Sequence, residues 1–374
     1  MHVSDGIALN HLDRMTDSTG LIQHAIYGIP RRGSGYTTDD NARALSLCTR
    51  LWDRHSGDRM LSRVTTYLSF LEHARCPVRG FHNFLSYQRD WLDAEGTGDS
   101  QGQAVRALAE VLGSSLPDGY RALARELIDA VTPALADLRS LRAQAYVILA
   151  WGHLSMSGVK GFGPVENVAR SAAQRLVECY HRSQRPDWPW FESRMTYANA
   201  VLPHALFIAA RCWPEEDFLD LARVSFTFLD RETTVENVFW PVGNSDWYPR
   251  GEGKSPYDQQ PVEAVTMADA ALAGLALLGD VGGVGGEKYL AAFRRAHAWF
   301  HGQNSLHQPL VDVHCGSCYD GLQWSGVNRN QGAESTLAYL WAELNNKDNS
   351  TCVENRKPLI NTRSCSIATA TTPS

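Results

Sequence analysis

Apolar positions recur with the helical period along most of the chain, whereas strand-like alternation is nearly absent. Short breaks that carry Gly, Pro, Asp or Ser separate most of the periodic stretches, as is typical of helix ends. The pattern predicts helices at residues 39–54, 59–75, 101–113, 118–135, 140–154, 165–182, 197–212, 215–230, 261–278, 286–301 and 332–345. Two long gaps, 231–260 and 302–331, are rich in Trp, Tyr, Asn, Gly and Pro. Loops of that length in a compact domain usually carry function, and we expect the same here.

The predicted helices are of two kinds that alternate along the chain. Helices of the first kind open with polar residues and continue with small apolar ones. Those between them, such as 121–134 and 218–229, are amphipathic. The polar openings lie at residues 38–43, 99–104, 142–146, 196–200, 259–264 and 330–335.

This alternation predicts an all-α fold, an (α/α)6 toroid in which six buried inner helices are surrounded by six amphipathic outer ones. The inner helices of such a ring run parallel, so their polar openings would line a single cavity. The alternative is that these residues only cap their helices. Capping explains one residue per helix, but it explains poorly why Gln, Tyr, Arg and a second carboxylate accompany it, so we predict a cavity.

The carboxylates of the polar openings suit glycoside cleavage, which needs one protonated and one ionised carboxyl group beside the scissile bond. Adjacent Asp39 and Asp40 repel one another, which can raise the pKa of one of them. Glu263 lies in the first turn of its helix, with apolar residues beyond it. The sequence therefore indicates Asp40 and Glu263 as the catalytic pair, with Asp39, Asp99 and Glu334 as alternates. Each carboxylate taken singly could instead be a helix-start acid without chemistry.

Other polar and aromatic residues suit sugar hydroxyls and sugar rings. Arg43 could pair with the neighbouring aspartates or reach the substrate. Several of the 11 tryptophans lie in polar segments, where they either pack loops against the core or present flat ring faces on which sugars can stack. The candidate substrate-binding residues are Asp39, Arg43, Gln101, Gln144, Trp190, Tyr197, Asn199, Trp247, Gln260, Trp324, Asn330 and Gln331.

Composition narrows the class of protein. The net charge of −6 and the lack of a basic stripe argue against a nucleic-acid partner. The N-terminus does not resemble a secretory signal, and no run of apolar residues is long enough to predict a membrane span. Eight scattered cysteines are typical of a reducing compartment, so we expect a cytoplasmic protein. One CxxC at residues 315–318 follows a histidine but lacks a second ligand pair, so neither a metal nor a cofactor is expected.

The polar C-terminal stretch differs from the rest of the chain. Residues 346–374 are rich in Asn, Thr and Ser and poor in large apolar side chains. Such a composition predicts a disordered tail outside a catalytic domain of residues 1–345.

Four segments resemble a bacterial family of six-hairpin glycosidase-like proteins: HLDRMTD (11–17), GYTTDDNAR (35–43), DQQPVEA (258–264) and GVNRNQGAES (326–335). Members are encoded alone, or fused or adjacent to retaining-type glycosyltransferases and mannoside-processing enzymes. The resemblance covers about residues 8–345. It implies an (α/α)6 toroid, a carbohydrate ligand and a functional association with a glycosyltransferase. The motif positions Asp39, Asp40, Glu263 and Glu334 are those that the polar openings had already indicated.

Three functions are compatible with these features. The first is a glycoside hydrolase, inverting, that cleaves an oligosaccharide containing mannose or glucose. The second is a sugar epimerase or polysaccharide lyase on the same toroid, which would use His, Tyr or Arg to abstract a proton. The sequence offers only His204 at an inner position for that role, and His24, His82 and His204 are interpreted as satisfied core residues. The third is a non-catalytic carbohydrate-binding partner of a glycosyltransferase.

Overall fold

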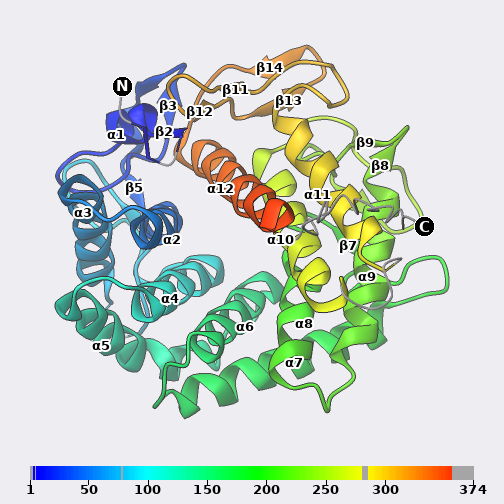
Figure 1. The fold of residues 1–374 in the computed structure, drawn as a ribbon, viewed down its shortest axis with the longest axis horizontal. Coiled ribbons are helices and arrows are strands. Elements are labelled where there is room, and N and C mark those ends of the chain that lie inside the picture. The colour runs from blue at the N-terminus through cyan, green and yellow to red at the C-terminus, as the bar shows by residue number, and fades with distance from the viewer. Residues whose placement is uncertain (1–2, 5, 77–78, 280–284, 356–374) are drawn as a thin grey trace, which may run out of the picture.

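The computed structural model describes residues 3–4, 6–76, 79–279 and 285–355. Its helices form two concentric rings (Figure 1). The inner ring consists of α2 (Thr38–Arg54), α4 (Gly98–Gly113), α6 (Leu141–Met156), α8 (Val201–Cys212), α10 (Pro261–Leu278) and α12 (Ala333–Asn355). The outer ring consists of α1 (Asn10–Met15), α3 (Asp58–Ala74), α5 (Asp118–Leu135), α7 (Gly163–Ser183), α9 (Phe218–Glu232) and α11 (Glu287–Phe300). Each inner helix packs against the next, and α12 packs back on α2, so the predicted (α/α)6 toroid is confirmed.

The inner helices are small and apolar because they are covered on nearly every side. In α4, for example, Ala104, Ala107 and Leu108 are fully buried. Gly102 of α4 faces α6, where an added Cβ would lie 2.9 Å from the carbonyl oxygen of Ala143. That distance is shorter than a van der Waals contact, so the close approach of these two helices requires glycine.

Helix α10 shows the same effect most strongly. By length and composition alone it could cross a membrane, but 61% of it is buried inside the protein. It packs against α8, α11 and α12. Burial within the ring therefore accounts for its apolar character.

The sixth outer helix, α1, is absent from the sequence prediction. It packs against α12 and so joins the N-terminal segment to the last inner helix. The backbone N–H of His11 donates to the carbonyl of Cys315, and its Nε2 lies 2.9 Å from the carbonyl oxygen of Gln331. The N-terminal segment therefore completes the double ring.

Short antiparallel strand pairs occupy the connections between helices. Among the described residues they form seven two-stranded sheets. The gaps 231–260 and 302–331, expected to be structureless loops, contain seven of these short strands: β8, β9 and β10 lie in the first gap, and β11, β12, β13 and β14 lie in the second. The strand pairs are β1 (Val3–Ser4) with β2 (Ile7–Ala8), β3 (Ala25–Ile26) with β4 (Ile29–Pro30), β5 (Tyr36–Thr37) with β6 (Phe84–Leu85), β7 (Arg194–Met195) with β10 (Tyr248–Pro249), β8 (Thr234–Val235) with β9 (Val238–Phe239), β11 (Val311–Asp312) with β12 (Ser317–Cys318), and β13 (Gly321–Gln323) with β14 (Gly326–Asn328).

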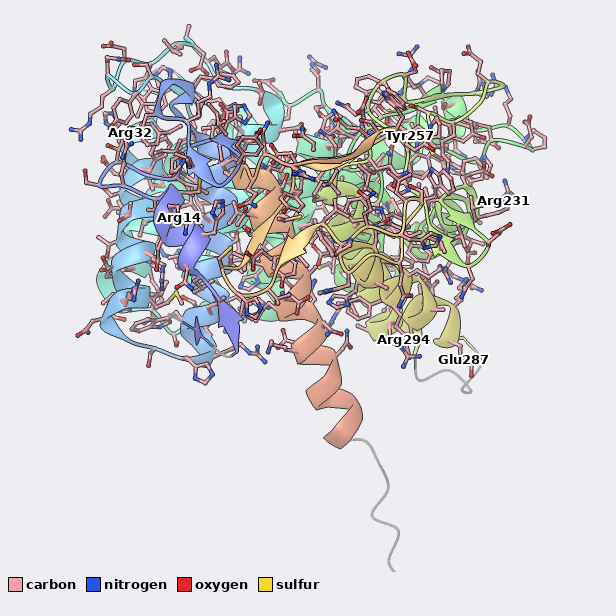
Figure 2. All side chains as sticks on the ribbon, turned by 90° about the horizontal axis from the view of Figure 1, so that it is seen from above. Arg14, Arg32, Arg231, Tyr257, Glu287 and Arg294 are labelled. Atoms are coloured by element: carbon pink, nitrogen blue, oxygen red, sulfur yellow. The ribbon has the colours of Figure 1, made fainter. Side chains whose placement is uncertain are left out.

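Two predicted boundaries are wrong. Helix α8 begins at Val201 rather than at residue 197, because Ala198 adopts a positive φ of 44° that a helix cannot contain. Helix α12 continues to Asn355, past the expected start of a tail at residue 346 (Figure 2). The rest of the expected tail, 356–374, lies outside the described residues.

The described cysteines are free thiols: Cys48, Cys76, Cys179, Cys212, Cys315 and Cys318. Cys315 lies in the turn of the β11–β12 hairpin, and Cys318 is a fully buried residue of β12. Within the described part of the chain, neither cysteine belongs to a group of side chains that could hold a metal ion.

Candidate active site

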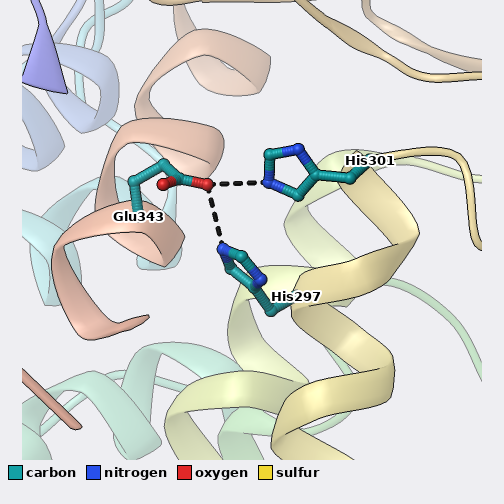
Figure 3. A group of neighbouring side chains, drawn as sticks. All are labelled: His297, His301 and Glu343. Carbon is teal, nitrogen blue, oxygen red and sulfur yellow. Dashed lines mark hydrogen bonds and ion pairs between the residues drawn. The ribbon is translucent and has the colours of Figure 1, made fainter. Parts of the chain in front are cut away.

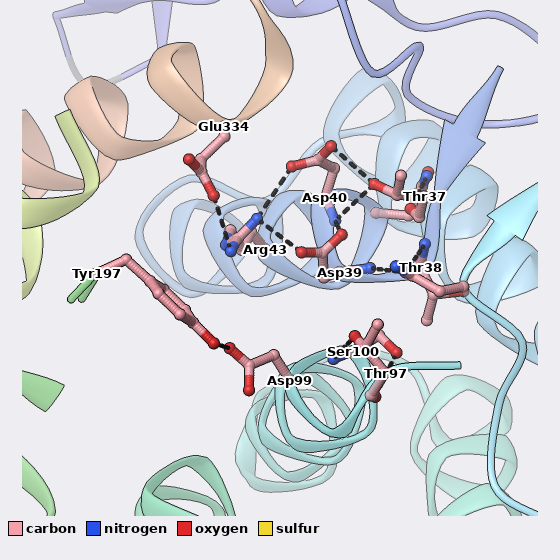
Figure 4. A network of polar contacts seen from close by, with 12 residues as sticks. Thr37, Thr38, Asp39, Asp40, Arg43, Thr97, Asp99, Ser100, Tyr197 and Glu334 are labelled. Carbon is pink, nitrogen blue, oxygen red and sulfur yellow. Dashed lines mark hydrogen bonds and ion pairs between the residues drawn. The ribbon is translucent and has the colours of Figure 1, made fainter. Parts of the chain in front are cut away.

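Hydroxyl side chains cap three of the inner helices. Thr37, Thr97 and Ser140 accept hydrogen bonds from backbone N–H groups in the first turns of α2, α4 and α6. Capping therefore explains these hydroxyl residues, as the alternative interpretation proposed. It does not explain the carboxylates that follow them, whose side chains form other contacts (Figure 4).

Three carboxylates meet at Arg43, a group that we call the Arg43 cluster: Asp39, Asp40, Arg43 and Glu334. Arg43 Nη1 lies 3.3 Å from Asp39 Oδ2 and 3.0 Å from Asp40 Oδ1. Its Nη2 lies 3.0 Å from Glu334 Oε2, which comes from the neighbouring helix α12. One guanidinium thus joins the openings of two inner helices and balances only part of the negative charge (Figure 4).

Asp40 is the most buried carboxylate of the Arg43 cluster, with 4% of its surface exposed. Burial, together with the neighbouring charges of Asp39 and Glu334, raises its pKa to about 8, against the opposing effect of Arg43. The hydroxyl of Thr37 donates to Asp40 Oδ2 at 2.7 Å. A carboxyl group with a pKa in this range can act as a general acid near neutral pH.

A cavity of about 320 Å³ opens onto the Arg43 cluster. Glu334 keeps 40% of its side-chain surface exposed, although burial of its carboxyl end raises its pKa. The cavity is lined by Gln23, His24, Asp39, Asp40, Arg43, Gln260, Asp320, Asn328, Gly332, Ala333, Glu334 and Ser335. Its lining offers mixed donors and acceptors, which is what sugar hydroxyls require.

A second group, the Arg142 cluster, contains Arg142, Glu192, Tyr197, Asn199 and Asp99. Arg142 donates from Nη1 to Glu192 Oε2 at 2.9 Å and from Nε to the carbonyl oxygen of Tyr197 at 2.6 Å. The Tyr197 hydroxyl donates to Asp99 Oδ2 at 2.7 Å, and Ser140 donates to the other oxygen at 2.9 Å. These bonds fix Asp99 beside the openings of α4 and α6.

Glu263 lies next to the Arg142 cluster rather than beside Asp40. Its carboxylate accepts hydrogen bonds from the backbone N–H groups of Ala198 and Asn199 and from Asn199 Nδ2. Burial raises the pKa of Glu263 to about 7, although these hydrogen bonds oppose the shift. Because both oxygens already accept donors from the turn before α8, Glu263 holds that turn in place. Its hydrogen bonds go to this turn, whereas Asp40 binds Thr37 and Arg43, so the pairing of Asp40 with Glu263 as acid and base stays a prediction.

Tyr146 of α6 connects the two clusters. It is buried, and the charges of Arg43, Asp99 and Glu334 all lie within electrostatic reach of its hydroxyl. Together with Arg43 and Glu334 it lines a small cavity of about 60 Å³ deeper in the ring. Five of the six polar openings thus supply residues to the two clusters, and the sixth meets them through Glu263, which binds Asn199, and Gln260, which lines the cavity, so the openings converge as predicted.

Four candidate substrate-binding residues serve the fold instead. Gln101 exchanges two hydrogen bonds with the backbone of Phe81, and Gln144 bonds to the carbonyl of Leu138 and to Arg175. Asn199 is occupied by Glu263 and by the backbone of Thr196. Trp190 is fully buried in the core. For these four the prediction of substrate contact is wrong.

The remaining candidates are compatible with substrate contact to different degrees. Gln260 lines the cavity, and Tyr197 and Trp324 are 37% and 79% exposed. Trp247 is partly buried, and its indole donates to Asn244 at 2.8 Å. Asn330 accepts from the backbone of Tyr27, and the Gln331 backbone bonds to the same residue. Their roles remain predictions.

Three residues of the site escaped the sequence analysis. His24 is an exposed residue that lines the cavity, so its interpretation as a core histidine is wrong. Asp320, in the gap between α11 and α12, accepts from the backbone of Gly332 at 2.7 Å, and burial raises its pKa. Arg142 lies within a polar opening, and its long, positively charged side chain is the feature of the sequence that could have identified it as a site residue.

No protein-family model and no curated protein sequence matches the chain. Solved structures do. A sugar epimerase from a ruminal bacterium matches with a TM-score of 0.68 at 12% identity, covering 91% of this chain and 97% of the epimerase. A D-mannose isomerase matches with a TM-score of 0.64 at 13% identity, covering 90% and 94%.

A GH76A α-1,6-mannanase from Salegentibacter matches with a TM-score of 0.60 at 11% identity, covering 90% of this chain and 96% of the mannanase. An inactive variant of that mannanase, with two consecutive aspartates replaced by asparagine, has been solved with α-1,6-mannotriose. At these identities the likeness establishes the fold, which is that of six-hairpin enzymes acting on carbohydrates.

Proposed function

We propose that this protein is a carbohydrate-active enzyme and, more specifically, a glycoside hydrolase that cleaves a mannose-containing oligosaccharide. The observation that carries the proposal is the Arg43 cluster, in which a protonated carboxyl group and two further carboxyl groups face one polar cavity. Hydrolysis of a glycosidic bond needs such a combination of acid and base.

The geometry favours Asp40 and Glu334 as the acid and base. Asp39 and Asp40 bind the same nitrogen of Arg43, so the two bonded oxygens are at most about 6 Å apart. Carboxyl groups of inverting enzymes are separated by about 6.5–9.5 Å, to leave room for a water molecule. Asp40 and Glu334 bind different nitrogens of the guanidinium, which permits that larger separation. We therefore assign Asp40 as the general acid, Glu334 as the base that activates water, and Asp39 as a residue that sustains the raised pKa of Asp40.

Support for mannose comes from the mannanase structures. The inactive mannanase variant carries changes at two consecutive aspartates, and this chain has consecutive Asp39 and Asp40 at the opening of an inner helix. This parallel in residue type, on the same fold, is what motivates α-mannosides as the first substrates to test.

Sugar epimerisation is the second candidate, because His24 lines the same cavity and could act as a base. His204, the histidine that the sequence suggested for this role, lines a different cavity with Asp269 and Arg106. Burial lowers the pKa of His204 to about 4, so it remains neutral at that place.

The test is turnover of manno- and gluco-oligosaccharides, α-1,6-mannotriose among them, with new reducing ends measured against time. We expect Asp40→Asn to lower kcat by more than about 100-fold, as loss of a general acid does, while binding of the oligosaccharide persists. Asp118→Asn is the matched control, since Asp118 also begins a helix but has 94% of its side chain exposed. Full activity of both Asp40→Asn and Glu334→Gln would refute the assignment of acid and base. A product that is epimerised but not cleaved would show that the protein is an epimerase and not a hydrolase.

A further inference from the structure

Two histidines and a glutamate meet between α11 and α12 (Figure 3), and none of the three is among the residues that line the carbohydrate cavity. His297 Nε2 lies 2.9 Å from Glu343 Oε1, and His301 Nε2 lies 2.8 Å from the same oxygen. His297 lies in the last turn of α11 and His301 is the capping residue directly after it, so the four-residue spacing places both imidazoles on one side of the helix end. Glu343 comes from α12, the inner helix beside it.

The arrangement has the features of a three-ligand metal site. The candidate ligand atoms of His297, His301 and Glu343 all lie within 4.8 Å of one another. In a tetrahedral zinc site with Zn–N and Zn–O distances of about 2.0–2.2 Å, ligand atoms lie about 3.3 Å apart. Small side-chain rotations would therefore bring the two nitrogens and one oxygen into that geometry.

Neighbouring rings hold the imidazoles in place. His297 stacks on Phe293 with 6.2 Å between ring centroids and 22° between planes. Tyr339 packs edge-on against His301 at 6.2 Å and 69°. Ligands that are already oriented lose little conformational entropy when a metal binds, which favours affinity.

The solvent exposure of the three side chains also suits a metal site. His297 and Glu343 have 16% and 17% of their side-chain surface exposed, whereas His301 has 35%. A metal could enter from the His301 side and keep one coordination position open to water. Two imidazoles and one carboxylate that converge on one point match the His2Glu ligand set of catalytic zinc sites.

We propose that His297, His301 and Glu343 bind a divalent transition metal, with zinc as the preferred ion. Imidazole and carboxylate ligands in this number suit zinc, and nickel and copper are the competitors expected from ligand chemistry. The bound ion would fasten the last outer helix to the last inner helix, close to the place where α12 packs back on α2. The site would therefore stabilise the closure of the toroid.

The experiment is calorimetric titration of zinc chloride into full-length protein that carries no polyhistidine tag and has been dialysed against a chelator. We expect one zinc ion per chain and a thermal midpoint that rises with zinc concentration. His301→Ala and Glu343→Gln should each weaken binding by more than about 100-fold, because loss of outer-shell partners alone costs about 10- to 100-fold. The matched control is His181→Ala, which removes an exposed histidine of another outer helix, α7.

Cobalt(II) provides a readout that depends on geometry and not on stability. A site with three protein ligands and one water should give the intense visible absorption of a tetrahedral ion, and that absorption should vanish in both variants but persist in the control. Lack of saturable zinc binding would overturn the proposal. Binding of equal strength in His301→Ala and Glu343→Gln would overturn it as well, because the metal would then bind elsewhere.

Discussion

Replacing Asp40 by asparagine should change how the stability of the protein depends on pH. The carboxyl group of Asp40 has a pKa of about 8 in the folded protein, against an ordinary value of 3.8. Between these values the folded protein keeps a proton that the unfolded chain has lost. Raising the pH therefore favours unfolding, so the contribution of this group is fully present below the unfolded pKa and is lost as pH rises through the folded pKa.

The magnitude follows from the size of the shift. Each pKa unit corresponds to about 1.4 kcal/mol, so a shift of about four units is equivalent to at most about 6 kcal/mol of unfolding free energy. Asp39 and Glu334 share Arg43 with Asp40 and take up part of the change when Asp40 is removed, so the measured value should be smaller. The amide has no proton to lose, so Asp40→Asn should gain stability relative to the wild type as the pH rises from about 5 to about 8.

The assay is reversible urea unfolding of wild type and Asp40→Asn at several pH values in that range, with Asp118→Asn as control. The pKa of Glu263 is raised and that of His204 is lowered, so the two groups change the pH dependence of stability in opposite directions. Both groups are present in all three proteins, so their contributions cancel when the unfolding free energies are compared. The control should follow the wild type, because Asp118 is almost fully exposed. The same pH slope in Asp40→Asn and wild type would show that Asp40 does not hold its proton at neutral pH, and the reasoning would fail.

Three further substitutions separate structural from functional roles. Glu263→Gln removes the charged acceptor of three N–H donors, so it should cost about 1–3 kcal/mol of unfolding free energy, measured by urea unfolding; an unchanged midpoint would contradict the structural role. Trp190→Ala should cost about 3–5 kcal/mol by leaving a cavity in the core, with KM of the folded protein unaltered in a steady-state assay. Trp324→Ala should change stability by less than about 0.5 kcal/mol, and a raised KM would show that its exposed ring stacks on substrate, whereas an unchanged KM would exclude it from the site.

The fold could be predicted because its determinants are local and repeated. Every inner helix needs small apolar residues on all sides and every outer helix needs one polar face, so the alternation along the chain already specifies a double ring. Helix α1 was not predicted because its six residues are too few to show the helical period of apolar positions. The strands were not predicted for the same reason, because strands of two or three residues are too short to show a detectable alternation of apolar and polar residues.

The side chains of the site could be predicted only in part. The sequence shows that Asp39 and Asp40 begin an inner helix, and the ring geometry brings them to Glu334 and Arg43. It does not show where a long side chain points. Gln101 turns back to Phe81, a residue of the preceding connection, and no pattern within α4 indicates that choice.

Glu263 illustrates the same limit. Its direction depends on Ala198, whose left-handed backbone presents an N–H to the carboxylate, and alanine is an unusual residue for that conformation. The contact of His297 and His301 with Glu343 likewise joins two helices across the long connection between them, so it is visible only in three dimensions.

The central claim is that the openings of the inner helices form a site where an acid and a base cleave a glycosidic bond. Turnover of α-1,6-mannotriose and related oligosaccharides in water enriched in oxygen-18 tests it most directly, with the products analysed by mass spectrometry. The account predicts one heavy oxygen at each new reducing end with the wild type, and formation of these labelled ends at least about 100-fold more slowly with Asp40→Asn. Products without label, or sugars altered without cleavage, would contradict it.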